Sequence, residues 1–173
     1  LVFEKIYHRQ VLPTLIKNPV LRVLSRPTLT KKLLYRIIGR KIKAAFGGRL
    51  EGVFIGGASL NREIEIFLRA GGIPYVCVYG LSECAPIVTA SSVKDSKIGS
   101  VGHAIPECSV KIDEPDPDSG VGEILVKGPN VMTGYYKNEA ATAQVFTPDG
   151  WLITGDRGYL DEDGFLSIRG RSK

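Results

Sequence analysis

The sequence lacks any long hydrophobic run, and it has few cysteines and histidines. No stretch of about 18 apolar residues occurs, which excludes a membrane-spanning helix. The three cysteines, Cys77, Cys84 and Cys108, form no CxxC pair and no zinc-type spacing with His8 or His103. An odd number of cysteines without a disulfide framework indicates reduced thiols, so we expect a cytoplasmic protein.

The chain also begins without an initiator methionine, and its first residues lack the basic-then-apolar layout of a signal peptide. We therefore expect a piece of a longer polypeptide. With 173 residues, of which 43% are hydrophobic and 24% charged, the piece is large enough for one good core or two small ones.

Acidic residues are absent from a long first part of the chain. Between Lys5 and Arg49 there are twelve lysines and arginines and no aspartate or glutamate. All but one of the 18 acidic residues follow this part, and outside it the charge balance is −7. Such asymmetry indicates an anionic partner for the first part, whether a membrane surface, a nucleic acid or a phosphorylated ligand.

Within this basic part, residues 28–46 have helical periodicity. Thr28 or Thr30 can cap the start, and Gly47-Gly48 ends the helix. Its predicted apolar stripe consists of Leu29, Leu33, Leu34, Ile37, Ile38, Ile42 and Ala45. A basic amphipathic helix can lie at the inner face of a membrane, but more often it packs on a sheet with its charges in solvent.

The middle of the chain predicts a parallel α/β arrangement. Residues 52–58 form a short apolar strand that ends in a glycine-rich turn, 61–70 form a helix and 74–80 form a buried strand. Ligands bind beyond the carboxyl ends of strands in open parallel sheets. The segments at these ends are Gly57-Ala58 and residues 80–83, so we expect a binding site there.

From about Lys97 the pattern changes to short strands separated by turn signals, with a brief helix at 138–144. We expect antiparallel strands at 109–112, 122–127, 151–154 and 165–169. They predict a small barrel-like or curled subdomain. The predicted division is 1–95, a basic helical segment with a parallel α/β subdomain, and 96–173, an antiparallel β subdomain.

Several motifs in this order resemble the adenylate-forming (AMP-binding) superfamily and, within it, the long-chain fatty-acid–CoA ligases. The segment Tyr79-Gly80-Leu81-Ser82-Glu83 is similar to the family's Tyr-Gly-x-Thr-Glu, with serine in place of the commoner threonine. The similarity covers roughly residues 49–173, and the ordered spacing makes accident improbable. The other matching segments are Gly99–Gly102, Gly122–Pro129, Gly134–Tyr136, Gly150–Asp156 and Phe165–Lys173.

The resemblance implies a role for each polar residue of these motifs. Tyr79 would offer a face to the purine, Ser82 a hydroxyl to the α-phosphate and Glu83 a carboxylate oxygen to Mg²⁺. Asp156 would accept the ribose hydroxyls, and Arg171 would add a planar cation near ribose or phosphate. The backbone at Gly57, Ala58 and Gly80 would approach the nucleotide closely. Ser82 and Glu83 are the candidate catalytic residues, and Lys173 resembles the hinge to a smaller domain.

Each of these residues also has an ordinary structural explanation. Tyr79 could be a strand aromatic, Asp156 a turn cap, Glu83 a surface acid and Arg171 a solvated charge. Their occurrence together and in order favours function.

Two further residues, Cys84 and His103, are interpreted as structural. Cys84 has no nearby histidine to activate it as a nucleophile, and we interpret it as a small filler residue. His103 follows the glycine loop 99–102, and we expect it to support the structure rather than to contact the acyl carboxylate.

The resemblance also implies segments that this chain does not show. A Ser/Thr/Gly-rich phosphate loop should precede it, and nothing in residues 1–49 resembles one. A small domain that supplies a lysine should follow Lys173. We expect a fatty-acid–CoA ligase that uses ATP, Mg²⁺ and coenzyme A. We expect this piece of it to be inactive by itself. The open alternatives are an aryl–CoA ligase, an amino-acid adenylation domain, or a non-catalytic module that binds lipid or nucleic acid; for a ligase, no nucleic acid partner is expected.

Overall fold

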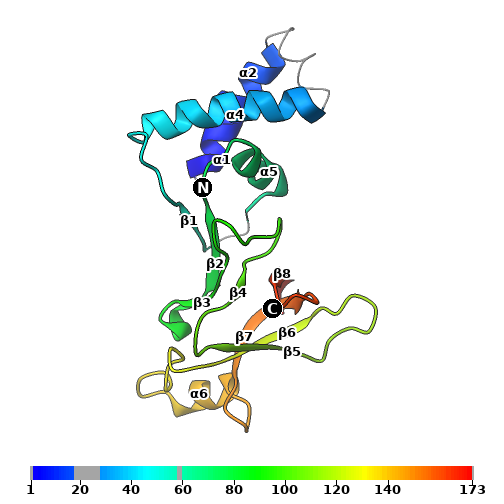
Figure 1. Ribbon diagram of the computed structural model, residues 1–173. Helices are drawn as coiled ribbons and strands as arrows, with labels where there is room; N and C mark the ends of the chain where they lie inside the picture. Colours follow the sequence, from blue (N-terminus) through cyan, green and yellow to red (C-terminus); the bar gives the residue numbers. More distant parts are fainter. Residues whose placement is uncertain (1, 18–27, 58–59, 173) are drawn as a thin grey trace. The chain divides into compact units, whose positions relative to one another are not determined.

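A computed structural model describes residues 2–17, 28–57 and 60–172 (Figure 1). The protein is of the α/β class, as predicted, and its chain divides into two compact units. One contains residues 1–53 and 60–75, and the other contains residues 54–59 and 76–173. This division follows contacts rather than the change of strand pattern, so the boundary between 1–95 and 96–173 stays a prediction. Among the described residues no helix combines the length and hydropathy needed to cross a bilayer.

The first unit is helical in its described residues. It contains α1 (Val2–Ile6), a π-helical turn (Tyr7–Val11), α2 (Leu12–Lys17), α4 (Thr28–Ala45) and α5 (Arg62–Ala70). The π-helical turn precedes Pro13, which has no N–H to continue the regular ladder. Asn61 caps α5 by accepting a hydrogen bond from the Glu63 N–H at 2.8 Å.

Aromatic rings form the centre of this unit. Phe67 is fully buried, with the Tyr7 ring at 5.3 Å and the Tyr35 ring at 5.1 Å, the latter edge-on. The two tyrosine hydroxyls are 3.2 Å apart. Burial raises the pKa of Tyr35 above its usual range, so the Tyr35 hydroxyl stays protonated.

The predicted stripe on α4 was wrong in part. The buried side of the helix is centred on Tyr35 and Gly39, whereas Leu33 and Ile37 are 60% and 46% exposed. The reason is a close helix contact, because a Cβ on Gly39 would lie 2.0 Å from the Gly71 oxygen. Glycine lets α4 approach the end of α5, and this contact sets which face is turned inward.

In its described residues the second unit contains two four-stranded sheets (Figure 1). The first has the order β1-β2-β3-β4, from β1 (Phe54–Ile55), β2 (Val76–Gly80), β3 (Ile87–Ala90) and β4 (His103–Ala104). Only β1 and β2 pair in parallel; the other pairs are antiparallel. The sheet is therefore mixed rather than parallel, and the sequence analysis did not predict β3 and β4.

The second sheet is antiparallel throughout, in the order β5-β6-β7-β8. Its strands are β5 (Ser109–Asp113), β6 (Gly122–Lys127), β7 (Leu152–Leu160) and β8 (Leu166–Arg171), and α6 (Glu139–Val145) lies between β6 and β7. In the described residues this antiparallel sheet is open and forms no closed barrel. β7 is longer than the predicted strand 151–154 because it continues past Asp156 to pair with β8.

One hydrophobic core joins the two sheets of this unit. Its fully or nearly fully buried members come from both, and they are Cys84, Val88, Cys108, Ile124, Val126, Leu152 and Leu166. The glycine loop adds backbone bonds between them: Val101 N–H donates to the Leu166 oxygen at 2.8 Å, and Leu166 N–H donates to the Gly102 oxygen at 2.9 Å. The two sheets of this unit are therefore held together by a shared core.

Candidate nucleotide site

The candidate site begins where β1 and β2 end. These strands are parallel neighbours, so their carboxyl ends lie at one edge of the sheet. Gly57 follows β1 with a φ of +77°, a backbone conformation that favours glycine. Gly80 ends β2, and a Cβ there would lie 1.7 Å from the Pro86 oxygen. Ala58, the neighbouring predicted residue, lies outside the described residues.

Tyr79 and Asp156, which are 77 positions apart, meet by a hydrogen bond. The Tyr79 hydroxyl donates to Asp156 Oδ2 at 2.9 Å. Burial raises the pKa of Tyr79 well above its usual range, and the nearby Asp156 carboxylate raises it further, so the hydroxyl remains a donor. The tyrosine is thereby fixed to the carboxylate rather than free to rotate as an isolated strand aromatic.

Asp156 also receives Arg171 from the adjacent strand. The two residues are register partners of β7 and β8, and Arg171 Nε lies 3.1 Å from Asp156 Oδ1. The aspartate side chain is 16% exposed and that of the arginine 72%. Each carboxylate oxygen has two lone pairs, so both keep an acceptor position after these contacts.

Glu83 projects from a 3₁₀ turn, Ser82–Cys84, that follows β2. The Tyr135 hydroxyl donates to Glu83 Oε1 at 2.9 Å, and this bond raises the pKa of Tyr135. Ser82 is exposed at the start of the turn. Cys84 is fully buried, and burial raises its pKa to about 11, so its thiol is not a nucleophile near neutral pH.

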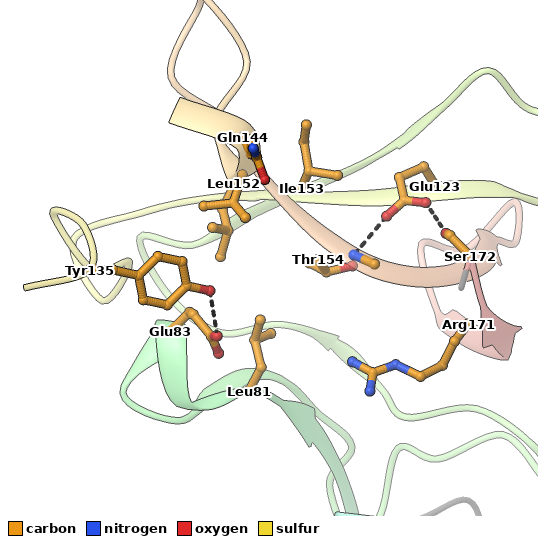
Figure 2. A pocket seen from close by; sticks show the side chains of 12 residues that line it. Leu81, Glu83, Glu123, Tyr135, Gln144, Leu152, Ile153, Thr154, Arg171 and Ser172 are labelled. Atoms are coloured by element: carbon orange, nitrogen blue, oxygen red, sulfur yellow. Dashed lines mark hydrogen bonds between the residues drawn. The ribbon is translucent and has the colours of Figure 1, made fainter. Parts of the chain in front are cut away.

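A pocket of about 470 Å³ lies beside these groups (Figure 2). This volume is within the range of about 300–1,000 Å³ of small-molecule sites. In Figure 2 Tyr135 and Glu83 lie at one side, and Glu123, Ser172 and Arg171 lie at the other. The pocket is lined by Leu81, Glu83, Glu123, Tyr135, Gln144, Val145, Leu152, Ile153, Thr154, Gly155, Arg171 and Ser172.

Of the predicted site residues, Glu83 and Arg171 line this pocket directly. Tyr79 and Asp156 join it through the Asp156–Arg171 contact. Gly57 and Ser82 do not line it, and Lys173 lies outside the described residues.

No role was predicted from the sequence for Glu123 or Tyr135. Glu123 accepts a hydrogen bond from the Gly155 N–H at 2.7 Å and a second from the Ser172 hydroxyl. It thus fixes the backbone next to Asp156. Both residues belong to motifs quoted from the sequence, but only the fold shows which side chain each one contacts.

The glycine loop 99–102 does not line the pocket. A Cβ on Gly102 would lie 2.0 Å from the backbone of Ala90, so the loop packs tightly on β3. The next residue, His103, has its ring 3.9 Å from that of Phe165 and its Nε2 3.6 Å from Asp95. The structural role of this histidine stays a prediction.

Polar contacts from β2, β7 and β8 thus lie in or next to one pocket of the second unit. The AMP-binding enzyme family model matches residues 6–136, about three quarters of the chain, and the chain belongs to this family.

Particular relatives can be named beyond the family. The chain is 44% identical over 138 residues to long-chain-fatty-acid–CoA ligase FadD15 of Mycobacterium bovis, which covers 80% of this chain and 22% of that protein. It is 34% identical to 2-succinylbenzoate–CoA ligase of Listeria innocua, over 95% of this chain and 33% of that protein. Among solved structures, o-succinylbenzoate coenzyme A synthetase of Bacillus subtilis in complex with ATP and magnesium ion is similar. Its TM-score is 0.64 and its identity 32%, and the match covers 77% of this chain and 30% of that one. The chain thus spans between a fifth and a third of the length of these proteins.

Proposed function

We propose that this chain is part of an ATP-dependent acid–thiol ligase, which joins a carboxylic acid to AMP and then transfers the acyl group to coenzyme A. The observation that carries the proposal is the convergence of Glu83, Arg171 and the Tyr79–Asp156 pair on one pocket in a chain of the AMP-binding family. The solved relative with bound ATP supports a nucleotide as the ligand.

In this proposal Asp156 holds the ribose. Its carboxylate is oriented by Tyr79 and Arg171, so it needs little reorganisation when the sugar hydroxyls arrive. The Tyr79 ring lies next to the purine, and the backbone at Gly57 approaches the base edge. The backbone at Gly80, where the absent side chain makes room for the Pro86 oxygen, also lies near the nucleotide. The Ser82 hydroxyl donates to an oxygen of the α-phosphate.

The residues present fit a magnesium ion that is held mainly by the nucleotide. Mg²⁺ usually keeps several waters and takes one or two carboxylates together with substrate phosphates. Among the described residues there is no group of three or more His, Cys, Asp or Glu side chains arranged around a metal. Glu83 offers one carboxylate at the pocket, and its Oε1 is oriented by Tyr135. When bound there, the ion would supply positive charge at the phosphates.

The chemistry assigned to the chain's own residues is electrostatic. As the carboxylate attacks the α-phosphate of ATP, the bond to the β-phosphate breaks and pyrophosphate leaves. Negative charge grows on the phosphate oxygens in this step, and preorganised donors stabilise it. Ser82 is the donor that this chain contributes, and Arg171 adds a cation within reach of ribose or phosphate oxygens. Ser82 and Glu83 therefore remain the proposed catalytic pair.

The proposed acid is a long-chain fatty acid, supported by the 44% identity to a long-chain-fatty-acid–CoA ligase. The measurement is the activity of the complete polypeptide that carries this chain toward acids of graded chain length. Formation of acyl-AMP and acyl-CoA should rise toward long chains. Preference for an aromatic acid such as 2-succinylbenzoate would instead favour the aryl–CoA ligase alternative.

The residues 1–173 by themselves are proposed not to catalyse adenylation, because nothing in the sequence of residues 1–49 resembles the family's Ser/Thr/Gly-rich phosphate loop. ATP–pyrophosphate exchange by this piece should stay at background, while the complete polypeptide exchanges. Exchange by the piece alone would contradict the assignment of the triphosphate grip to another segment.

A peripheral membrane contact is proposed for α4. Leu33 and Ile37 are exposed on a helix that carries basic residues and no acidic one. Cosedimentation of the complete polypeptide with vesicles that contain anionic lipid should fall when both are replaced by serine. Equal binding of the double variant would show that α4 makes no such contact.

A further inference from the structure

The turn that carries Glu83 has an unfavourable backbone. Ala85 ends the 3₁₀ turn in the left-handed region, at φ 51° and ψ 53°, although it is not glycine. It also precedes Pro86, and a residue before proline favours an extended conformation. Such a turn persists only when its surroundings hold it.

Asn130 holds this turn on both of its sides. Its Nδ2 donates to the Cys84 oxygen at 3.0 Å and to the Ile87 oxygen at 2.8 Å. These two carbonyls flank the Ala85-Pro86 corner. One primary amide has two N–H donors, so a single side chain satisfies both carbonyls at once.

The same segment contacts Glu83 at two further points. The Met132 N–H donates to the Glu83 backbone oxygen at 2.7 Å, and the Tyr135 hydroxyl donates to its carboxylate. A turn closed by the bond from Val131 N–H to the Gly128 oxygen shapes the segment itself. Residues 128–135 therefore fix Glu83 through its backbone, its carboxylate and the corner that follows it.

We propose that Asn130 is a positioning residue for Glu83, which keeps the glutamate carboxylate directed at the phosphate side of the pocket. Asn130 itself does not line the pocket, so it acts through the turn rather than on a ligand. This role rests on the proposed function, because it concerns the part of ATP that Glu83 serves. The ribose side depends instead on Asp156, Tyr79 and Arg171.

Because Glu83 serves the phosphates and Asp156 serves the ribose, the two sides of the pocket can be tested separately. In the complete polypeptide, Asn130→Asp removes both donors and places carboxylate oxygens beside two carbonyls. Asn138→Asp is the matched control, because Asn138 caps α6 by accepting from the Ala141 N–H, and an aspartate accepts equally well. Calorimetry would measure the affinity for ATP at a series of Mg²⁺ concentrations, and separately the affinity for AMP without Mg²⁺.

For Asn130→Asp we expect the gain in ATP affinity produced by Mg²⁺ to fall about tenfold, as would follow from one lost charge-assisted contact. AMP affinity should change less than twofold, and kcat of adenylation should fall more than KM for the acid rises. Asn138→Asp should match the wild type in all of these. Asn130→Ala, which brings no charge to the carbonyls, should give a smaller loss in the same direction and serves if the aspartate variant does not fold.

Two results would overturn the positioning role. One is an Asn130 variant that behaves as Asn138→Asp, and the other is an equal loss of AMP and of Mg²⁺-assisted ATP affinity, which would indicate general unfolding of the site. The proposed function fails separately, if the wild-type polypeptide forms no acyl-AMP with any carboxylic acid.

Discussion

The two units of the molecule differ in their internal packing. In the helical unit the centre is Phe67 with two tyrosine rings, and α4 approaches α5 through Gly39. In the second unit an apolar core joins two sheets, and polar contacts between residues far apart in sequence lie at its edge. The candidate chemistry lies in the unit where distant polar residues meet. In the helical unit, polar contacts such as the Tyr75 hydroxyl donating to Glu65 Oε1 at 3.0 Å are buried within its packing.

The largest effect on this contrast should come from Asp156→Ala, tested in the complete polypeptide. The change removes the proposed ribose acceptor and leaves Arg171 without its partner. We expect kcat/KM for adenylation to fall about 10²-fold, since two charge-assisted hydrogen bonds to the carboxylate are lost. Pyrophosphate exchange is the measurement.

Asp118→Ala provides the control for this loss, because Asp118 is exposed in the same unit and does not line the pocket. Activity of Asp156→Ala within twofold of the control would contradict the ribose assignment. It would also remove the main chemical difference between the two units.

A smaller effect, on stability rather than on chemistry, is expected from Gly39→Ala. The added Cβ would lie 2.0 Å from the Gly71 oxygen, so the two helices must separate. We expect a loss of about 1–3 kcal/mol in the free energy of unfolding of the helical unit, with AMP affinity changed less than twofold. Denaturant unfolding followed by circular dichroism measures the first, and calorimetry measures the second.

Gly52→Ala is the matched control, because nothing lies within 4 Å of a Cβ at that position. If Gly39→Ala is as stable as this control, the close approach of α4 to α5 is not what sets the buried face of the helix. If Gly39→Ala also lost AMP affinity, packing in the helical unit would affect nucleotide binding in the second unit.

How far the sequence predicts each unit follows from the range of the contacts involved. The bounds of α5 and α6 were predicted within a residue or two, because Asn61 and Asn138 cap them and caps are local signals. The buried face of α4 was predicted wrongly in part, because Gly39 contributes nothing to a hydrophobic pattern although it decides the packing. β3 and β4 were missed because both are short, with four and two residues.

The candidate site shows the same limit. Motif order pointed to Tyr79, Glu83, Asp156 and Arg171, and the fold brings them to one pocket or next to it. No local pattern could show that Tyr135 donates to Glu83, because 52 residues separate them. The contact depends on the shared core that places the loop after β6 beside the turn after β2.

The smallest expected effect concerns the thiols, all three of which lie in the second unit and are buried. Burial raises the pKa of Cys84 to about 11, from an ordinary value near 9, so the folded state favours the neutral thiol. Its contribution to stability is full below pH 9 and is lost as pH rises through about 11. Between these values the second unit should lose a little stability, and Cys84→Ala should remove that part of the pH dependence.

Thiol labelling turns this into a test of the contrast between the units. At pH 8 none of the three cysteines should react with a thiol reagent until the second unit opens, because each is buried. Gly39→Ala, which is expected to loosen only the helical unit, should therefore leave the labelling rate unchanged. Faster labelling in that variant would mean that opening the helices also opens the β core, and the two units would then unfold as one.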